Sequence, residues 1–495
     1  MGELLALAIL LAVIALVIAR LPKVDVGHTD AFRRRRVMNW LPIGLMYAFL
    51  YMARYNLKKS QEAFQLIENA SGDSIMDSAG FATIFGVGTA VYAFSFIING
   101  PLTDRFGGRR VILLAAVGAA VSNVAMGFGA WTLLNHGPLY DLFASKFLIL
   151  FSLFYGVNMY FQSFGAVAIV KVNAPWFHVR ERGVFGAIFG ILISLGVYFA
   201  YDWSRIILDN FGLANVFFVP AGLLVLVIAL VAWLTRDTPG EAGFEDFDAA
   251  DQKWGKDGEN LSAARLFAMM LTNPIILIIA SIEFCSGYLR QAIQQWYTTY
   301  ADQTDAILHL KSAFVNQHWG ILLCAAGIMA ATVAGVISDH VFQSRRGPVA
   351  ALLYGAVLGG SVLLTFVYAT PMVGWLVVFM YMAVVGVHGM LSGTASMDFG
   401  GKQNVGKVVG IIDGFVYLGS TVMSFVYARL IPETTLEDGA LTGPGLDPAT
   451  WWTWPVGMIP LAVVGLLLAS RIWNAKPTSR PTPPADAAAS VEKAA

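Results

Sequence analysis

Two arginines, Arg54 and Arg290, lie deep inside apolar segments and are the strongest candidates for binding chemistry. A charged side chain at mid-membrane costs at least about 2.5–3.5 kcal/mol, so it normally faces a polar cavity or a partner. The two positions are 290 − 54 = 236 residues apart, and each guanidinium offers a planar fork that fits an oxyanion bidentately. We interpret the pair as a site for a small dianion such as phosphate. The alternative is that each arginine pairs with an intramembrane acid and only holds helices together.

Other polar residues near these arginines extend the predicted site. Lys58 and Lys59 follow Arg54 by about one helical turn and reach either the cavity or the outer interface. Lys171 ends an apolar segment, where it is either a cavity cation or a cytoplasmic anchor. The hydroxyl groups of neighbouring tyrosines and the amide of Asn56 could form hydrogen bonds with a polyol substrate. The predicted substrate-binding residues are Arg54, Arg290, Tyr51, Tyr55, Asn56, Lys58, Lys171 and Tyr288.

Two carboxylates inside apolar segments are candidates for coupling. Glu283 precedes Arg290 by seven residues, which places both on one helical face. Asp413 lies well inside another apolar segment and is a suitable partner for an arginine or a lysine. A carboxylate whose pairing changes with substrate could carry gating or proton coupling, and a static salt bridge is the alternative. We interpret His388 as an interhelical histidine rather than a proton relay.

These residues are carried by thirteen apolar segments, each about 20 residues or longer and able to cross the hydrocarbon of a bilayer as a helix. The first segment has no basic region before it and carries its positive charge afterwards. We therefore interpret it as an extra transmembrane helix rather than a cleaved signal peptide. The segments are 2–20, 38–59, 80–101, 110–134, 146–170, 184–204, 213–235, 272–299, 313–338, 347–369, 371–396, 406–430 and 452–472.

The composition excludes most other classes of protein. Of 495 residues, 57% are hydrophobic and 13% are charged, with 32 Lys and Arg against 32 Asp and Glu. Such a chain cannot cover a soluble surface, and its charge balance indicates no nucleic-acid partner. Cys285 and Cys324 lie in apolar runs and indicate neither disulfides nor a metal site. We expect a monomer in the lipid bilayer, with no cofactor, no metal and no catalytic residues.

Lysines and arginines concentrate in every second loop, which predicts the orientation of the chain. The N-terminus is then outside and the C-terminus is in the cytoplasm, in a plasma (inner) membrane.

A polar linker separates six core segments from six more. The predicted parts are an extra helix, a basic linker, a first six-helix bundle, a central linker, a second bundle and a disordered tail, at 1–22, 23–37, 38–235, 236–271, 272–472 and 473–495.

A short loop motif occurs in both halves. Asp104 and Arg105 follow the second core segment in GPLTDRFGGRR, and Asp339 stands at the matching place in GVISDH, 339 − 104 = 235 residues later. Glycine permits a tight turn, and Asp can pair with a neighbouring helix end, as a gating loop requires. The predicted coupling and gating residues are Asp413, Glu283, Asp104, Arg105 and Asp339.

This loop resembles the signature loop of the major facilitator superfamily. The resemblance implies an all-α polytopic membrane protein of two six-helix bundles with pseudo-twofold symmetry, here with one extra N-terminal transmembrane helix. In this arrangement the symmetry axis would bring Arg54 and Arg290 to opposite walls of one central cavity.

More specifically, the chain resembles the organophosphate:phosphate antiporter family, whose members transport glycerol 3-phosphate, hexose phosphates and phosphoglycerates. In that family, arginines on the first and seventh helices bind phosphate, so the resemblance implies this role for Arg54 and Arg290. It also implies rocker-switch exchange of external organic phosphate for cytoplasmic inorganic phosphate. The segments that carry the resemblance are Tyr51-x-x-Arg54-x-Asn56, Arg180-Glu-Arg-Gly183, Arg236-Asp-Thr-Pro239, Gly287-Tyr-Leu-Arg290 and Gly406 through Gly419.

Two positions depart from the family pattern. Relatives have a lysine on the second helix where this chain has Phe96, and often a histidine on the fifth helix where it has Ile193. Either Lys58, Lys59 or Lys171 replaces the missing charge, or the substrate differs from that of the bacterial relatives.

We therefore predict a secondary active transporter of a small organic phosphate of the sugar-phosphate or glycerol-phosphate type, exchanging it for inorganic phosphate by alternating access. Two alternatives stay open: a proton-coupled symporter of another organic anion, and a transporter-like sensor of sugar phosphate. The stretch Ile411–Gly414 is more similar to sugar-phosphate exchangers, which leaves the organic part of the substrate open.

Overall fold

The computed structural model describes residues 27–69, 72–178, 181–246, 268, 272, 274–342 and 345–474. The side chains of 182–187 and 392–409 lie outside the described part. The predicted extra helix at 2–20 lies outside the described residues, as do most of the central linker and nearly all of the tail.

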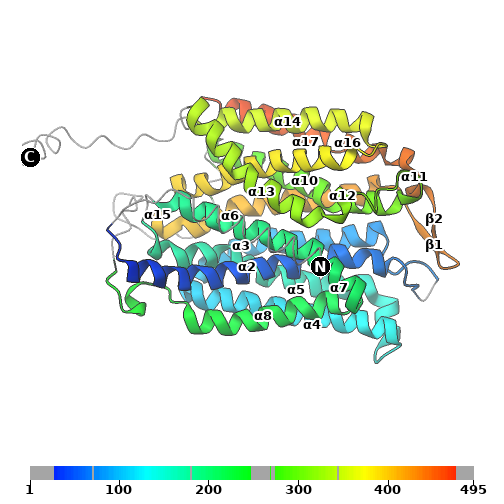
Figure 1. The fold of residues 1–495 in the computed structure, drawn as a ribbon, viewed down its shortest axis with the longest axis horizontal. Coiled ribbons are helices and arrows are strands. Elements are labelled where there is room, and N and C mark those ends of the chain that lie inside the picture. Colours follow the sequence, from blue (N-terminus) through cyan, green and yellow to red (C-terminus); the bar gives the residue numbers. More distant parts are fainter. Residues whose placement is uncertain are drawn as a thin grey trace, which may run out of the picture.

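The described chain forms two groups of long helices that run roughly side by side (Figure 1). The first group comprises α2 (Asp30–Phe64), α3 (Ser78–Phe106), α4 (Gly108–Asn135), α5 (Tyr140–Asn173), α6 (Arg182–Tyr198), α7 (Ser204–Phe211) and α8 (Asn215–Leu234). The second group comprises α10 (Pro274–Gln303), α11 (Asp305–Leu308), α12 (Phe314–Gln317), α13 (Trp319–Val336), α14 (Arg346–Val367), α15 (Val373–Leu430), α16 (Thr453–Val456) and α17 (Ile459–Arg471). Short helical turns are η1 (Ala174–Trp176), η3 (Phe199–Trp203), η4 (Gly240–Ala242), η5 (Ile337–Val341), η6 (Pro444–Leu446) and η7 (Pro448–Trp452).

Ten helical segments in the described part are long and apolar enough to cross a membrane. Two of them, Val373–Leu391 and Gly410–Leu430, lie within α15 and correspond to the predicted segments 371–396 and 406–430. Helix α2 contains the predicted segment 38–59, and α13 covers residues 319–336 of the predicted segment 313–338. The predicted all-helical, polytopic fold is therefore confirmed.

Local sequence explains where several of these helices begin. The Thr29 hydroxyl accepts a hydrogen bond from Phe32 N at 3.2 Å, so α2 starts at Asp30, inside the segment predicted as a basic linker. Between α3 and α4, Gly107 has φ of +84°, which favours glycine. A Cβ on Gly108 would lie 2.9 Å from the backbone nitrogen of Val172, so this glycine lets α4 approach α5 closely.

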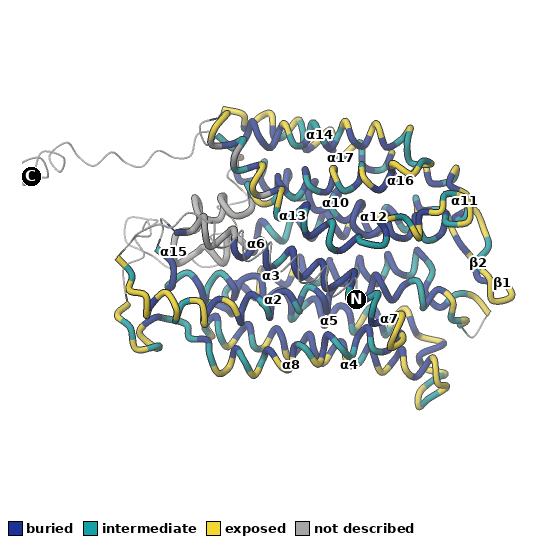
Figure 2. The backbone as a smooth tube through the Cα atoms, in the orientation of Figure 1, coloured by how far each residue is buried: buried dark blue, intermediate teal, exposed yellow. Residues whose placement is uncertain are grey.

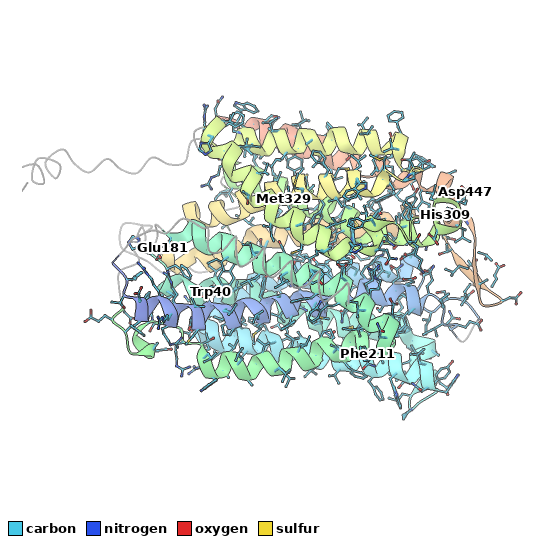
Figure 3. The ribbon with its side chains drawn as sticks, viewed as in Figure 1. Trp40, Glu181, Phe211, His309, Met329 and Asp447 are labelled. Atoms are coloured by element: carbon cyan, nitrogen blue, oxygen red, sulfur yellow. The ribbon has the colours of Figure 1, made fainter. Side chains whose placement is uncertain are left out.

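The two ends of the molecule differ in character. One end, which we call the basic end, carries the start of α2, where Arg36 Nη1 bonds both carboxylate oxygens of Glu181 at 2.9 Å. The opposite end, the hairpin end, carries the antiparallel strands β1 (Thr435–Glu437) and β2 (Ala440–Thr442). Figure 3 places Glu181 at the first end, and His309 and Asp447 at the second.

The segment after α8 ties the basic end of the first group together. The backbone amide of Arg236 donates to Asn39 Oδ1 of α2, and Asp237 Oδ1 accepts from the amide of Arg109 in the first turn of α4, both at 2.8 Å. Burial raises the pKa of the Asp237 carboxyl above its ordinary value, although this hydrogen bond opposes the shift. The Arg-Asp-Thr-Pro motif thus has a structural role, because it joins α2 and the start of α4.

Burial is distributed as a membrane protein requires. The contact surfaces between helices are buried, and the outward faces are exposed (Figure 2). Large apolar side chains on those faces, such as Phe94, Val121, Leu226 and Phe366, are exposed. Such a surface suits lipid, which replaces water as the solvent of the outer face.

The two groups meet along two pairs of helices. Helix α3 of the first group packs on α15 of the second, and α6 packs on α13. Within the second group, Gly287 of α10 and Gly419 of α15 sit at a close crossing, where a Cβ on either residue would overlap a backbone carbonyl of the other helix. This crossing places Arg290, one turn beyond Gly287, against the interface between the groups.

Candidate anion-binding site between the two helix groups

Helix α2 carries Arg54 into the interior, where its side chain is completely buried. Its Nε donates to Gln162 Oε1 of α5 at 2.9 Å, and its Nη2 donates to the Tyr92 hydroxyl of α3 at 3.2 Å. Its Nη1 donates to the Tyr417 hydroxyl of α15, in the other half of the molecule. The three acceptors are neutral, so these hydrogen bonds orient the guanidinium without neutralising its charge.

Aromatic rings complete the surroundings of Arg54. Its Cζ lies 4.7 Å from the ring centroid of Tyr51 and 4.6 Å from that of Tyr92, within the range of cation–π attraction. The Tyr155 hydroxyl donates to the Arg54 carbonyl at 3.1 Å, which fixes the backbone as well. The structure therefore surrounds Arg54 with tyrosine side chains, which form a tyrosine cage, and among the described contacts its guanidinium forms no ion pair with an acid.

Arg290 has different surroundings. It lines a cavity of about 30 Å³, and its guanidinium makes no hydrogen bond or ion pair with the residues that the structure describes. The residues around this cavity are Tyr47, Tyr51, Tyr92, Arg290, His388, Asp413, Val416 and Tyr417. A cavity of this size holds one or two water molecules, so a phosphate group enters only if side chains around it move.

The two arginines converge on the same tyrosines. Tyr51, Tyr55 and Tyr417 lie within electrostatic range of both guanidinium groups. Tyr51 and Tyr417 line the cavity with Arg290 and also contact Arg54. Arg54 therefore lies behind a layer of tyrosine side chains, whereas Arg290 faces the cavity directly.

A carboxylate and an imidazole form a pair on the second half of this site. Glu283 of α10 is fully buried, and its Oε2 lies 2.8 Å from His388 Nδ1 of α15. His388 and Asp413 line the Arg290 cavity. The histidine thus contacts another helix, as expected of an interhelical histidine, but it also borders the candidate site.

Lys58 lies nearer the hairpin end, in a second cavity of about 20 Å³. Its Nζ donates to Gln61 Oε1 at 2.7 Å and to the Thr299 hydroxyl of α10. The same atom lies 4.5 Å from the ring centroid of Phe81. These contacts, with Lys59 and Asp302 beside them, hold the ammonium group apart from the Arg290 cavity.

Three other predicted substrate-binding residues bond elsewhere. Asn56 Nδ2 donates to Asn123 Oδ1 at 2.8 Å and to the Val216 carbonyl at 3.0 Å, within the first group. The Tyr288 hydroxyl donates to the Gly457 carbonyl at 3.2 Å, within the second group. Lys171 pairs with Asp104, away from the cavity. Tyr51 lines the cavity, and the Tyr55 hydroxyl accepts from Gln291 Nε2 of α10 at 3.0 Å.

The gating-loop residues lie at the basic end. Asp104 Oδ1 and Lys171 Nζ form an ion pair at 2.9 Å between α3 and α5. Arg105 is exposed, with its guanidinium carbon 5.8 Å from the ring centroid of Phe106. The backbone of Asp339 belongs to η5, and its side chain lies outside the described part.

Residues 37–424 match the sequence profile of the Major Facilitator Superfamily. The chain belongs to this superfamily. The matched residues run from α2 to near the end of α15 and so include helices of both groups.

Curated relatives of this facilitator share about a quarter of its sequence. It is 22% identical to a glycerol-3-phosphate transporter of Bacillus subtilis, over 91% of this chain and 96% of the relative. It is 26% identical to the membrane sensor protein UhpC of Salmonella typhimurium, over 83% and 88%, and 23% identical to the hexose-6-phosphate:phosphate antiporter of Escherichia coli, over 88% and 89%. The predicted similarity to organophosphate:phosphate antiporters is therefore confirmed.

Solved facilitator structures share the fold. A bacterial homologue of the human lysosomal transporter Spinster, in an inward-facing and unoccupied conformation, aligns with a TM-score of 0.61 at 14% identity, over 92% of this chain and all of that one. The nucleoside transporter NupG aligns with a TM-score of 0.57 at 13% identity, over 90% and 98%. These similarities concern the fold alone.

The two residues that depart from the antiporter pattern, Phe96 and Ile193, both lie in apolar surroundings. Phe96 lies beside the tyrosine cage, with its ring 4.9 Å from that of Tyr92, so an apolar ring occupies that region. Ile193 packs against the hydrophobic core. Lys171 is paired with Asp104, and Lys58 lies in the second cavity. In this conformation neither of these two lysines lines the Arg290 cavity.

Polar contacts link the two halves of the facilitator at the hairpin end. Gln65 Nε2 at the end of α2 donates to the Thr434 hydroxyl at 2.7 Å. Lys311 and Glu62 form an ion pair across the halves. The guanidinium of Arg205 donates to the carbonyl of Asn316 at 3.2 Å. Together with the contact of Lys58 with Thr299, these bonds join the two halves at the hairpin end.

Several residues of the site were absent from the sequence-based prediction. Gln162, Tyr92 and Tyr417 bond Arg54, and Tyr47 lines the cavity. The amide of Gln162 inside an apolar segment was a signal of the same kind as Arg54 itself. The tyrosines gave no such signal, because tyrosine is ordinary in helix packing.

Proposed function

We propose that this facilitator is a secondary active transporter of a small organic phosphate, which it exchanges for inorganic phosphate across the inner membrane of a bacterium. The observation that carries the proposal is Arg290, a guanidinium that faces a central cavity without a hydrogen-bonded protein partner among the described residues, beside the caged Arg54. The functions named for the glycerol-3-phosphate and hexose-6-phosphate relatives support it. The cargo is translocated unchanged, with no catalytic step.

Phosphate binding in this site involves an exchange of hydrogen-bond partners. Arg290 receives the anion first, because its guanidinium already faces the cavity. The hydroxyls of Tyr92 and Tyr417 now occupy two nitrogens of Arg54. A phosphate oxygen is a stronger acceptor than a neutral hydroxyl, so the anion displaces them and links one arginine of each half.

This linkage provides the coupling between binding and movement. In the structure the direct connection of Arg54 to the second half runs through Tyr417. When phosphate replaces the Tyr417 hydroxyl, the attraction of both halves to the anion offsets the loss of contacts between the halves at the hairpin end.

We assign the basic end to the cytoplasm because of its arginines. The C-terminus is then in the cytoplasm and the N-terminus is outside. We propose a monomer as the functional unit.

Exchange in proteoliposomes tests the proposal. The purified protein is reconstituted with inorganic phosphate inside, and uptake of radiolabelled phosphate is measured with and without external glycerol 3-phosphate or glucose 6-phosphate. We expect uptake that needs internal phosphate and is inhibited by one of the two esters. Arg290→Lys keeps the charge but loses the planar fork, and should abolish uptake. Arg33→Lys, at an exposed arginine of the basic end, is the matched control and should retain it.

The alternatives give different results in the same preparation. Uptake of a non-phosphate anion driven by an inward proton gradient, without phosphate exchange, would indicate a symporter. Binding of a sugar phosphate without any flux would indicate a sensor, a possibility raised by the relative UhpC. Full exchange by Arg290→Lys would contradict the assigned site.

A further inference from the structure

The Glu283–His388 pair is unusual because one member is sequestered and the other borders the cavity. The Glu283 side chain has no exposed surface, whereas a quarter of the His388 side chain is exposed (25%). Nδ1 of His388 is engaged by the Glu283 carboxylate at 2.8 Å. Nε2 is therefore the polar atom of the ring that remains for the cavity that His388 lines.

The carboxylate has few other partners. Glu283 Oε1 is buried without a hydrogen bond to any described residue. An ionised carboxylate in an apolar interior is costly unless it is paired. The imidazole supplies that partner, and in return the carboxylate fixes the orientation of the ring. A carboxylate that engages one ring nitrogen fixes the orientation of a histidine whose other nitrogen is left to bind a ligand.

We propose that His388 is a third phosphate-binding group of the site, held in position by Glu283. The proposal rests on the proposed transport of phosphate esters and adds a specificity-determining residue to it. His388 takes the place of the cation that Phe96 and Ile193 do not supply, but it does so from the second half of the molecule, beside Arg290.

The chemistry of the imidazole makes this group responsive to pH. The protonated ring donates Nε2–H to a phosphate oxygen, a charge-assisted hydrogen bond. The neutral ring, with its proton on Nδ1 toward Glu283, presents a lone pair that can accept only from a protonated phosphate. Affinity should therefore weaken as the ring loses its proton. The other titratable or charged groups that face His388 are Glu283 and Arg290 from α10, Tyr47 and Tyr51 from α2, Tyr92 from α3, and Asp413 and Tyr417 from α15.

The test compares wild-type protein with His388→Gln from pH 6 to pH 8.5. KM for labelled phosphate is measured in exchange, and binding is followed independently by the thermal shift that inorganic phosphate produces in purified protein. The titration of phosphate itself is common to both proteins, so the ratio of their KM values isolates the histidine. We expect this ratio to be about tenfold at pH 6, the loss of one charge-assisted hydrogen bond, and close to one at pH 8.5.

A second variant and a control separate binding from structure. Glu283→Gln removes the carboxylate that holds the ring of His388 in position, so KM for phosphate should rise toward the value of His388→Gln. His318→Gln alters a histidine at the hairpin end whose ring stacks on Phe314, and its KM should equal the wild-type value at every pH.

Each outcome is informative. A ratio that does not change with pH, or an unchanged KM in His388→Gln, overturns the proposal and assigns the histidine to packing. Absence of exchange in the wild type refutes the transport function alone, because the thermal shift still reports whether His388 binds phosphate. Absence of both exchange and a phosphate-induced shift in the wild type overturns both proposals.

Discussion

The carboxylate of Asp202 caps a helix of the opposite half by accepting a hydrogen bond from the backbone amide of Gly320 at 2.7 Å. A second bond comes from the amide of Ile321 at 2.9 Å. Asp202 belongs to η3 of the first group, and the two amides lie in the first turn of α13. A Cβ on residue 320 would lie 2.7 Å from Asp202 Oδ1, so glycine permits the contact. The cap therefore holds the first and second groups of helices together near the hairpin end.

Weakening this cap should favour opening of the hairpin end. Asp202→Asn removes the charge that complements the helix terminus and leaves one good acceptor, a loss of about 1 kcal/mol, so the open population should rise about fivefold. Thr298→Cys places a thiol in the second cavity at a hydroxyl that makes no hydrogen bond to a described residue, and its rate of labelling by a membrane-impermeant maleimide reports that population.

The matched control for this prediction is Asp209→Asn, at an exposed position on α7 of the same half. It should leave the labelling rate unchanged. Equal labelling in Asp202→Asn and the control would show that the cap does not hold the hairpin end closed.

The two arginines should differ in their contribution to stability. Arg54→Lys leaves at least one of its three buried acceptors without a donor, and hydrogen bonds of a charged group contribute about 1.5–3 kcal/mol each. Arg290→Lys removes no hydrogen bond to a described residue. Thermal unfolding in detergent should therefore show a Tm several degrees lower for Arg54→Lys and little change for Arg290→Lys, while both abolish exchange. Equal Tm values would contradict the tyrosine cage.

Lys58 should affect closure rather than phosphate affinity. Its ammonium is bonded to Gln61 and Thr299 in the second cavity, apart from Arg290. Lys58→Gln should leave KM for phosphate within about twofold of wild type, because no ion pair with the substrate is lost, and should increase maleimide labelling at the hairpin end. A rise in KM of tenfold or more would instead make Lys58 a phosphate ligand.

The glycine in the Gly-Tyr-Leu-Arg motif should be required for helix packing. A Cβ on Gly287 would overlap the carbonyl of Val416, so Gly287→Ala must separate α10 from α15 at a cost of about 1–3 kcal/mol. Expression and Tm should fall. Gly355→Ala on α14, where a Cβ would meet nothing within 4 Å, is the control and should be neutral. Tolerance of both substitutions would refute the close crossing.

The fold class was predictable because it depends on local properties of the chain. Apolar length determines whether a helix can span a bilayer, and the described spans lie where uninterrupted apolar segments were found. The gating loop around Asp104 and the arginines 236 residues apart then indicated a repeated architecture. Helix ends were less predictable, as the start of α2 at Asp30 shows, because a single cap such as Thr29 decides them.

By itself, the sequence determined that Arg54 and Arg290 are intramembrane charges on corresponding helices. Only the tertiary structure decided that Arg54 is enclosed by tyrosines while Arg290 faces the cavity, and that His388 pairs with Glu283, 105 residues away. The reason is physical: helices that are apolar on nearly all sides carry little signal of their rotation. Which face meets a cavity depends on close crossings between helices distant in sequence, and those contacts form only when the whole chain is packed.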